Sequence, residues 1–388
     1  NTDPIIATCA KRFEEKNKRY INLLVKEFEM RKNAQQYART TIARSGELDM
    51  DRLHEYKYNN DLFLKVSEVQ KGKSHGMVMF VDFSGSMTSM FGQTVEQTLI
   101  LAAFCRKVGI PFDVYGFSDR STELSALVAE GKLHSNMLGR KCDRLNTDTY
   151  KIEDESGFHL NHLISSSQHG NVYHRAYNML ATVAMNWHNR MYPKVPMPWD
   201  TLGFALGGTP FTQTLMASRP LIEAFRKTHK VDICNTIYLT DGEGCGCFTF
   251  PEVQSSKINP ETGKPAIQTK IFLVDRITKR RLEIDNNARY GGAWQAAMTA
   301  FVRDVSGAKH IGFYICETGS AKRSVGSENE AKFDKQWRED GYFCTPNIGY
   351  DMYYYVKQSN MNATDKDYDL SETMTSKKMG TVFSNAQA

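Results

Sequence analysis

The feature that most constrains the fold is an alternation of strand-like and helix-like segments that begins at Gly76. "MVMFVD" (77–82) is apolar until its last residue, and "TVEQTLILAAFCRKVG" (94–109) follows with apolar residues at helical spacing. Similar segments recur downstream in "LMASRPLIEAFRKTH", "CNTIYLTDG", "GGAWQAAMTAFVRDVSG" and "KHIGFYICE". Strands that alternate with helices need crossover connections, which predict a mostly parallel sheet covered on both faces. We therefore predict a doubly wound α/β domain.

The remaining sequence divides around this domain. We predict a helical N-terminal extension with an extended segment over 1–75, the α/β domain over 76–320, and a C-terminal extension with a polar tail over 321–388. The strand and helix rhythm is interrupted at about 119–200 and again at about 244–290. We expect both interruptions to be insertions at the rim of the domain, where partner contacts are often built.

Two of these regions carry more detailed predictions. From about Lys11 to Ala43, apolar residues recur near helical spacing, which predicts one long helix or a broken pair of helices that stops at Gly46. A turn, a short helical piece and the extended segment "LFLKVSEVQ" follow. In the second insertion, "IQTKIFLVD" and "KRRLEID" predict a hairpin with Thr278 to Arg280 at its tip.

Composition excludes several classes of protein. With 41% hydrophobic and 24% charged residues, the chain of 388 residues has a globular composition, and no apolar run is long enough for a membrane span. A net charge of +5 is too small to indicate nucleic-acid or membrane binding. The eight cysteines are scattered without a C-x-x-C pair, which favours reduced thiols and a cytoplasmic location.

Oxygen-bearing side chains follow three predicted elements of the domain. Asp82, Ser84 and Ser86 come directly after the first strand, Thr209 stands in "GGTPF" before a helix, and Asp241 ends the strand "NTIYL". In a doubly wound sheet, ligands bind beyond the carboxyl ends of the strands, where the strand order reverses. We therefore expect these five side chains to converge at one edge of the sheet.

The chemistry of this set suits a hard divalent cation. Carboxylate and hydroxyl oxygens are ligands for Mg²⁺, with Mn²⁺ or Ca²⁺ as alternatives. The hydroxyls add no charge, so a bound cation still attracts one more anion from outside. The alternative is purely structural: Ser84 and Ser86 cap the following helix, Asp82 stabilises its N-terminus, and Asp241 turns the chain.

The three loops together resemble the metal-ion-dependent adhesion site of von Willebrand factor A domains. The residues that carry the resemblance are D-x-S-x-S at Asp82, Ser84 and Ser86, then G-x-T-P, then a strand that ends in T-D-G. The resemblance implies that Asp82, Ser84, Ser86, Thr209 and Asp241 hold the metal and that a partner's carboxylate completes its coordination. The loops around Gly85, Gly208, Gly242 and Glu243 would then contact that partner.

A narrower resemblance spans about Gln35 to Phe117. "QQYARTTIARSGELDMDRLHEY", "VMFVDFSGSM" and "GIPFDVYGFSD" resemble the C-terminal half of the CobT subunit of cobaltochelatase and its viral relatives. This resemblance implies a non-catalytic subunit that pairs with a ring-forming AAA+ ATPase of the MoxR or CobS type, and that assembles as a homo-oligomeric ring itself.

Two further functions stay open at this stage. One is a stand-alone adhesion or ligand-binding A domain, and the other is a metal-dependent hydrolase. Hydrolysis is disfavoured because Ser84 lacks a G-x-S-x-G context and catalytic magnesium is usually held by carboxylates and substrate phosphate. "PETGKP" (260–265) lacks the flanking residues of a phosphate-binding loop, and His159, His162, His169 and His174 match no common zinc spacing.

Overall fold

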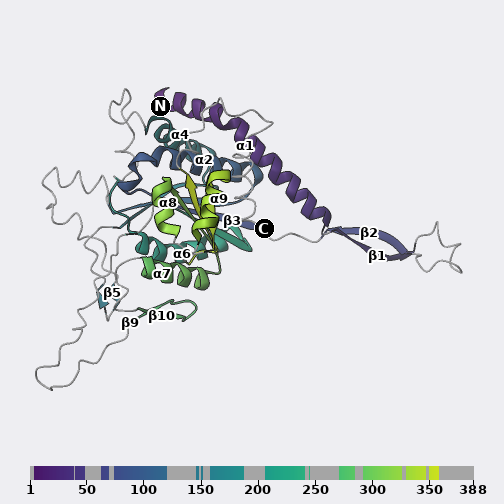
Figure 1. Cartoon of the computed structure of the whole chain (residues 1–388). Helices are drawn as coiled ribbons and strands as arrows, with labels where there is room; N and C mark the ends of the chain where they lie inside the picture. Colours follow the sequence, from purple (N-terminus) through teal and green to yellow (C-terminus); the bar gives the residue numbers. More distant parts are fainter. Residues whose placement is uncertain are drawn as a thin grey trace, which may run out of the picture.

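The chain folds around one central sheet (Figure 1). The computed structural model describes residues 4–38, 40–48, 63–69, 74–119, 146–147, 150–151, 158–187, 206–240, 244, 271–284, 292–325, 329–346 and 349–357. In these residues the sheet has seven strands in the spatial order β12-β13-β11-β8-β3-β4-β7. Their bounds are β3 His75–Asp82, β4 Phe112–Ser118, β7 His159–Ser165, β8 Ile233–Thr240, β11 Lys309–Cys316, β12 Tyr342–Thr345 and β13 Met352–Lys357.

The sheet is mostly parallel, which confirms the predicted α/β architecture. Strands β4, β3, β8, β11 and β13 are parallel to one another, whereas the edge strands β7 and β12 run antiparallel to them. From β3, the chain first adds β4 and β7 toward one edge of the sheet. It then returns to the other side of β3 and adds β8, β11 and β13 toward the opposite edge, so the strand order reverses between β3 and β8. This position is a topological switch point, where open α/β sheets bind ligands.

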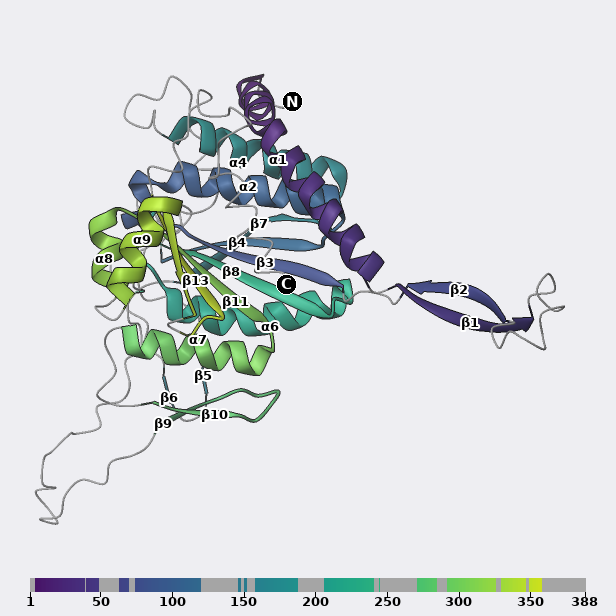
Figure 2. The ribbon, with the colours of Figure 1, turned by 45° about the vertical axis from the view of Figure 1, so that its right-hand side comes forward.

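Helices lie on both faces of the sheet (Figure 2). α1, α2 and α4 lie on one face, and α6 and α7 lie on the other, with α8 and α9 beside the β13 end. The bounds of the helices are α1 Pro4–Ala38, η2 Ser86–Ser89, α2 Phe91–Val108, α4 Gly170–Asn186, α6 Phe211–His229, α7 Gly292–Ser306, α8 Thr318–Val325 and α9 Glu330–Asp340. No helix in the described part of the chain is both long and apolar enough to cross a bilayer.

The two faces of β3 explain why it is apolar throughout. Met77, Met79 and Val81 belong to the core cluster beneath α1, α2 and α4, whereas Val78 and Phe80 belong to the cluster beneath α6 and α7. A central parallel strand is buried on both faces, so it carries a continuous apolar run instead of an alternating one. The run ends at the buried carboxylate that closes the strand.

The predicted C-terminal end of helix α2 is confirmed on physical grounds, whereas the helix begins at Phe91, three residues before the predicted segment. Gly109 follows Val108 with a positive φ of 74°, and its N–H donates to the carbonyl of Cys105. Glycine adopts this left-handed conformation without the steric cost of a Cβ, so it ends helices efficiently. Pro111, two residues later, cannot continue the helix, and β4 begins at Phe112.

The N-terminal region differs from the prediction beyond Ala38. α1 is a single helix of 35 residues that packs on the body, with Phe13 edge-on to Tyr177 at a centroid distance of 5.8 Å. The chain then forms β1 (Thr40–Leu48), which pairs antiparallel with β2 (Phe63–Val69). The helix predicted to reach Ala43 was therefore too long, because strand pairing with a distant segment overrides the local helical pattern. The ribbon β1-β2 extends away from the body (Figures 1 and 2).

Part of the first interruption belongs to the body of the domain. β7 pairs with β4 at the sheet edge, and α4 packs against α2 and α1. Residues 159–187 are therefore not a rim insertion. Two short strands, β5 (Asn146–Thr147) and β6 (Tyr150–Lys151), pair with each other in the same interruption.

The C-terminal region also contributes to the sheet. β13 pairs in parallel with β11, and Phe313 stacks on Tyr354 with ring centroids 5.1 Å apart. Residues 342–357 therefore complete the domain that was predicted to end near residue 320. The predicted polar tail lies outside the described residues, which end at residue 357. The short helical piece expected before "LFLKVSEVQ" and the "PETGKP" segment also lie outside them.

The predicted hairpin in the second interruption is confirmed. β9 (Ile271–Val274) pairs antiparallel with β10 (Arg281–Ile284), and residues 275–280 form the connecting turn. Thr278 to Arg280 lie in that turn, as predicted from the sequence. The hairpin lies beyond α7, on the side of that helix away from the central sheet (Figure 2).

Candidate functional site

Strand β3 delivers Asp82 to the carboxyl edge of the sheet at the switch point. It pairs with β4 on one side, with Asp82 opposite Phe117, and with β8 on the other. The Asp82 side chain has 0% of its surface exposed. Burying a carboxylate is costly unless polar or charged groups compensate it, so this position is a strong candidate for a binding site.

The turn after β3 holds the two predicted serine hydroxyls side by side. Ser84 Oγ and Ser86 Oγ are 2.9 Å apart, with Ser84 buried and Ser86 exposed. The N-cap residues of the next two helices are Gly85 and Met90, and neither helix has a side-chain cap. The capping alternative is therefore wrong for these serines, whose hydroxyls face each other instead of a helix N-terminus.

The second predicted loop meets the first directly. Gly85 N donates to the carbonyl of Gly207 at 2.6 Å, and Gly207 N donates to the carbonyl of Phe83 at 3.2 Å. Ser84 and Gly207 thereby form a parallel β-bridge. Thr209, two residues further on, is 6% exposed, and α6 begins at Phe211 without a side-chain cap. Two loops more than a hundred residues apart in sequence are thus joined at one sheet edge.

The third predicted loop, "LTDGEG", is described only at its two ends, Leu239–Thr240 and Gly244. β8 ends at Thr240, whose Oγ1 donates a hydrogen bond of 2.9 Å to Asp82 Oδ2. Asp241, Gly242 and Glu243 lie outside the described residues. The structure therefore brings together Asp82, Ser84, Ser86 and the Thr209 loop, and it adds Thr240 as a hydrogen-bond donor that the sequence did not single out.

A second carboxylate at this edge was also missed. Asp119 directly follows β4, and its Oδ1 accepts a hydrogen bond of 2.6 Å from Gly208 N. A Cβ at position 208 would lie 2.7 Å from Asp119 Oδ2, so a larger residue there would have to displace the carboxylate. The signal was present in "GFSD", where a carboxylate ends a strand next to the "MVMFVD" strand, but Asp119 was assigned to an insertion.

His159 on β7 is the histidine whose pKa responds to Asp119 at this edge of the sheet. Burial lowers the pKa of His159, whose strand pairs with β4 at Ser118, and the charge of Asp119 only partly opposes the shift. A histidine with a lowered pKa is neutral at neutral pH. His159 therefore does not cancel the negative charge of Asp119.

The donor set fits a hard cation in its chemistry. Among the described residues, no group of three or more His, Cys, Asp or Glu side chains is placed to hold a metal. The oxygen donors at the end of β3 are not such a cluster. They combine one buried carboxylate, that of Asp82, with the hydroxyls of Ser84, Ser86 and the Thr209 loop. Oxygen ligands of this type are those that Mg²⁺ takes, with water completing its octahedral coordination.

Comparison with known proteins does not identify the chain. No protein-family model matches it, and no curated protein matches it. Among solved structures, it is similar to the pilus adhesin SpaC from Lactobacillus rhamnosus GG in its open conformation, with 13% sequence identity and a TM-score of 0.35. That match covers 82% of this chain and 30% of the adhesin.

Asp119 is expected to position the Thr209 loop. In Asp119→Ala, Gly208 N loses its acceptor, and we expect the affinity for Mg²⁺ to fall about tenfold, a typical cost of removing a residue that orients a metal ligand. Asp119→Asn keeps an oxygen acceptor and should recover most of the affinity. Isothermal titration with Mg²⁺ checks both variants, and equal affinities for wild type and Asp119→Ala would contradict this role.

Proposed function

We propose that this chain contains a von Willebrand factor A-type domain, with the doubly wound topology of that class, that binds a divalent cation. Asp82, Ser84, Ser86, Thr209 and Asp241 would hold the cation, with Mg²⁺ as the first choice. The observation that carries the proposal is the β-bridge between Ser84 and Gly207 at the switch point, which joins the D-x-S-x-S turn to the G-x-T-P loop. The strand order around β3 supports it.

The chain's own residues would shape the binding surface in three ways. Thr240 orients Asp82 by donating to Oδ2, and the Gly85 to Gly207 hydrogen bond holds the two loops in register. Asp119 fixes Gly208, and with it the approach to Thr209. Gly85 and Ser86 are exposed, so the turn is accessible to a partner. When bound, the cation supplies a coordination position for an acidic side chain from outside.

We further propose that the partner is an AAA+ ATPase of the MoxR or CobS type, and that this chain is a non-catalytic subunit, resembling CobT, which presents substrates to it. The resemblance of residues 35–117 supports this role. A cytoplasmic location is part of this proposal, and it rests on the scattered spacing of the eight cysteines in the sequence. Ring assembly remains part of the same proposal.

The decisive experiment is metal-dependent capture of the ATPase. The full chain, immobilised, should retain a MoxR/CobS-type ATPase from the same genome in Mg²⁺ and release it in EDTA. Ser86→Ala should lose most of this capture, whereas Ser89→Ala is a matched control, since Ser89 is an exposed hydroxyl in the same turn. Undiminished capture in EDTA would contradict the metal bridge, and phosphoester turnover by the isolated chain would contradict a non-catalytic role.

A further inference from the structure

The β9-β10 hairpin presents apolar side chains to solvent. Leu273 and Leu282 pair across the two strands and pack against the core cluster beneath α6 and α7. Phe272 and Val274 alternate with them and are 43% and 45% exposed, and Ile277 in the turn is 60% exposed. These three are among only five large hydrophobic side chains that are exposed in the described residues. Apolar groups gathered in this way commonly mark interaction surfaces.

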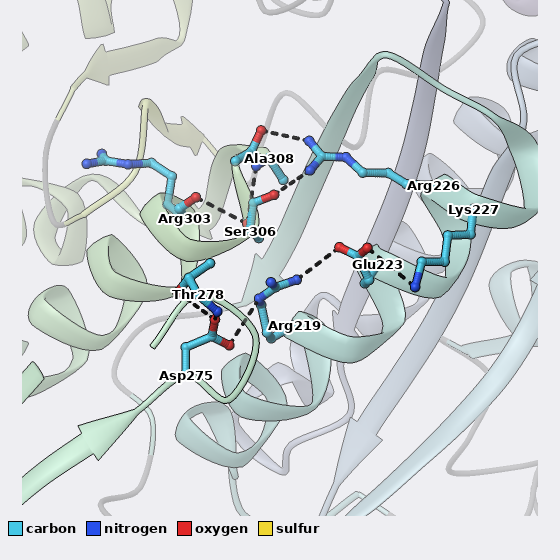
Figure 3. Close-up of polar contacts among 10 residues, drawn as sticks. Arg219, Glu223, Arg226, Lys227, Asp275, Thr278, Arg303, Ser306 and Ala308 are labelled. Carbon is cyan, nitrogen blue, oxygen red and sulfur yellow. Dashed lines mark hydrogen bonds and ion pairs between the residues drawn. The ribbon is translucent and has the colours of Figure 1, made fainter. Parts of the chain in front are cut away.

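The hairpin is held to the body by a buried ion pair (Figure 3). Arg219 of α6 lies 3.3 Å from Asp275 Oδ1, and their side chains are only 10% and 7% exposed. Asp275 Oδ2 accepts hydrogen bonds of 2.7 Å from both the backbone N and the hydroxyl of Thr278. Burial acts to raise the pKa of Asp275, but these hydrogen bonds and the charge of Arg219 lower it overall. The turn is therefore a defined structure, so binding a partner would cost little ordering entropy.

The same turn is strongly basic. Arg276, Lys279, Arg280 and Arg281 are all exposed, while Asp275 is matched by Arg219 within the protein. The only other acidic residue on the hairpin is Glu283, which faces Phe272 across the strands. We use "hairpin patch" for the exposed residues Phe272, Val274, Arg276, Ile277, Lys279, Arg280 and Arg281. Its net positive charge favours an acidic partner.

We propose that the hairpin patch binds an acidic polypeptide segment that also carries apolar side chains. The basic residues would pair with its carboxylates, and Phe272, Val274 and Ile277 would contact its apolar residues. An array of phosphates would pair with the basic residues but would leave Phe272, Val274 and Ile277 without apolar partners. A polypeptide supplies carboxylates and apolar side chains together.

This surface is separate from the proposed metal site. Arg219 lies eight residues beyond Phe211, the first residue of α6 after Thr209, which is roughly 12 Å along the helix at the rise of an α-helix. Binding at the hairpin patch should therefore be unaffected by EDTA. This independence separates the two proposals, because loss of one activity leaves the other measurable.

The experiment uses the full chain and a short fluorescein-labelled peptide composed of glutamate and leucine. Anisotropy titrations compare wild type with Ile277→Ser and with the double variant Arg276→Gln/Arg280→Gln, each in Mg²⁺ and in EDTA. Val172→Ser, at another exposed apolar position on α4, is the control for the first variant. Lys332→Gln/Lys335→Gln, two exposed lysines on α9, is the control for the second. An oligothymidylate and phosphatidylserine-containing vesicles are titrated in parallel.

We expect the wild type to bind the peptide in both buffers, and each hairpin variant to bind roughly tenfold or more weakly, as for the central residues of an interface. Both control variants should bind as wild type. Equal binding by the hairpin variants, or no binding by the wild type, would overturn the proposal. Tighter binding of the oligonucleotide or the vesicles than of the peptide would also overturn it, in favour of that ligand.

Discussion

Mg²⁺ is expected to stabilise the wild-type protein, and the Asp82→Asn variant is expected to lose that stabilisation while keeping its fold. At a concentration about 100 times its dissociation constant, a ligand of the native state adds roughly 2.7 kcal/mol of stability. For a domain of this size that corresponds to an increase in Tm of roughly 5 to 10 °C. Asparagine has the shape of aspartate and retains an oxygen that can accept from Thr240, but it lacks the charge that binds the cation. Thermal unfolding in Mg²⁺ and in EDTA measures the difference.

The EDTA arm separates metal binding from a structural role of this residue. Asp82 is fully buried, so replacing its charge with a neutral amide should leave the metal-free protein at least as stable as wild type. Ser89→Ala is again the control and should show the full shift with Mg²⁺. If Asp82→Asn were destabilised equally in Mg²⁺ and in EDTA, Asp82 would be a structural residue and the metal site would be excluded.

The His310→Leu variant is expected to remove much of the loss of stability below neutral pH. His310 lies on β11 with 0% exposure, and burial, aided by the charge of Arg303, lowers its pKa from 6.5 to about 3. Among the described residues, neither ring nitrogen has a hydrogen-bond partner, although the backbone N donates to Asp351 Oδ2 at 2.7 Å. The ring packs near Tyr238 in the core, at a centroid distance of 5.3 Å.

The sign follows from the two pKa values. Because the folded-state pKa is the lower one, the unfolded chain takes up the proton first, and acid favours unfolding. Above about pH 6.5, His310 is neutral in both states and its protonation does not lower the free energy of unfolding. As the pH falls toward 3, protonation of His310 in the unfolded chain lowers the free energy of unfolding, by about 2 kcal/mol between pH 7 and pH 5. Leucine has no proton to bind and no buried polar atom, so the variant should be at least comparable in stability at pH 7.

Urea unfolding at pH 7 and pH 5 tests this prediction. The difference between the two pH values should be smaller in His310→Leu than in wild type by about 2 kcal/mol. The carboxyl groups with lowered pKa values, Asp113 and Asp275, titrate below this window and do not interfere. His174→Gln, at an exposed position on α4, should keep the wild-type difference. Equal pH dependence in wild type and His310→Leu would contradict the prediction.

Much of the architecture was predictable because the strands of the sheet centre are buried on both faces. "MVMFVD" and "NTIYL" show this as continuous apolar runs, and the intervening helices show it as apolar residues at helical spacing. The edge strands were not predictable in the same way. β7, "HLNHLIS", is only partly buried, so its sequence lacks a clear pattern, and its identity as a strand depends on pairing with β4.

The candidate site was likewise only partly predictable from the sequence. The residue types and their order along the chain identified Asp82, Ser84, Ser86 and Thr209, because oxygen ligands at the ends of predicted strands have a recognisable chemistry. Thr240 could not be singled out by chemistry alone, since it acts through one hydrogen bond to a residue distant in sequence. Asp119 stands at the end of a strand, as Asp82 does, but its role depends on a hydrogen bond from Gly208, which only the structure shows. Asp241, the fifth predicted ligand, stays a prediction.

By itself, then, the sequence determined the α/β class, the central strands and helices, the hairpin at 271–284 and the proposed oxygen donors, because local apolar periodicity and residue chemistry depend on near neighbours. Only the tertiary structure decided the strand order, the switch point at β3, the bridge between Ser84 and Gly207, and the contribution of β7 and β13 to the sheet. These features arise from hydrogen bonds between segments far apart in the chain, and such pairing leaves little trace in either segment alone.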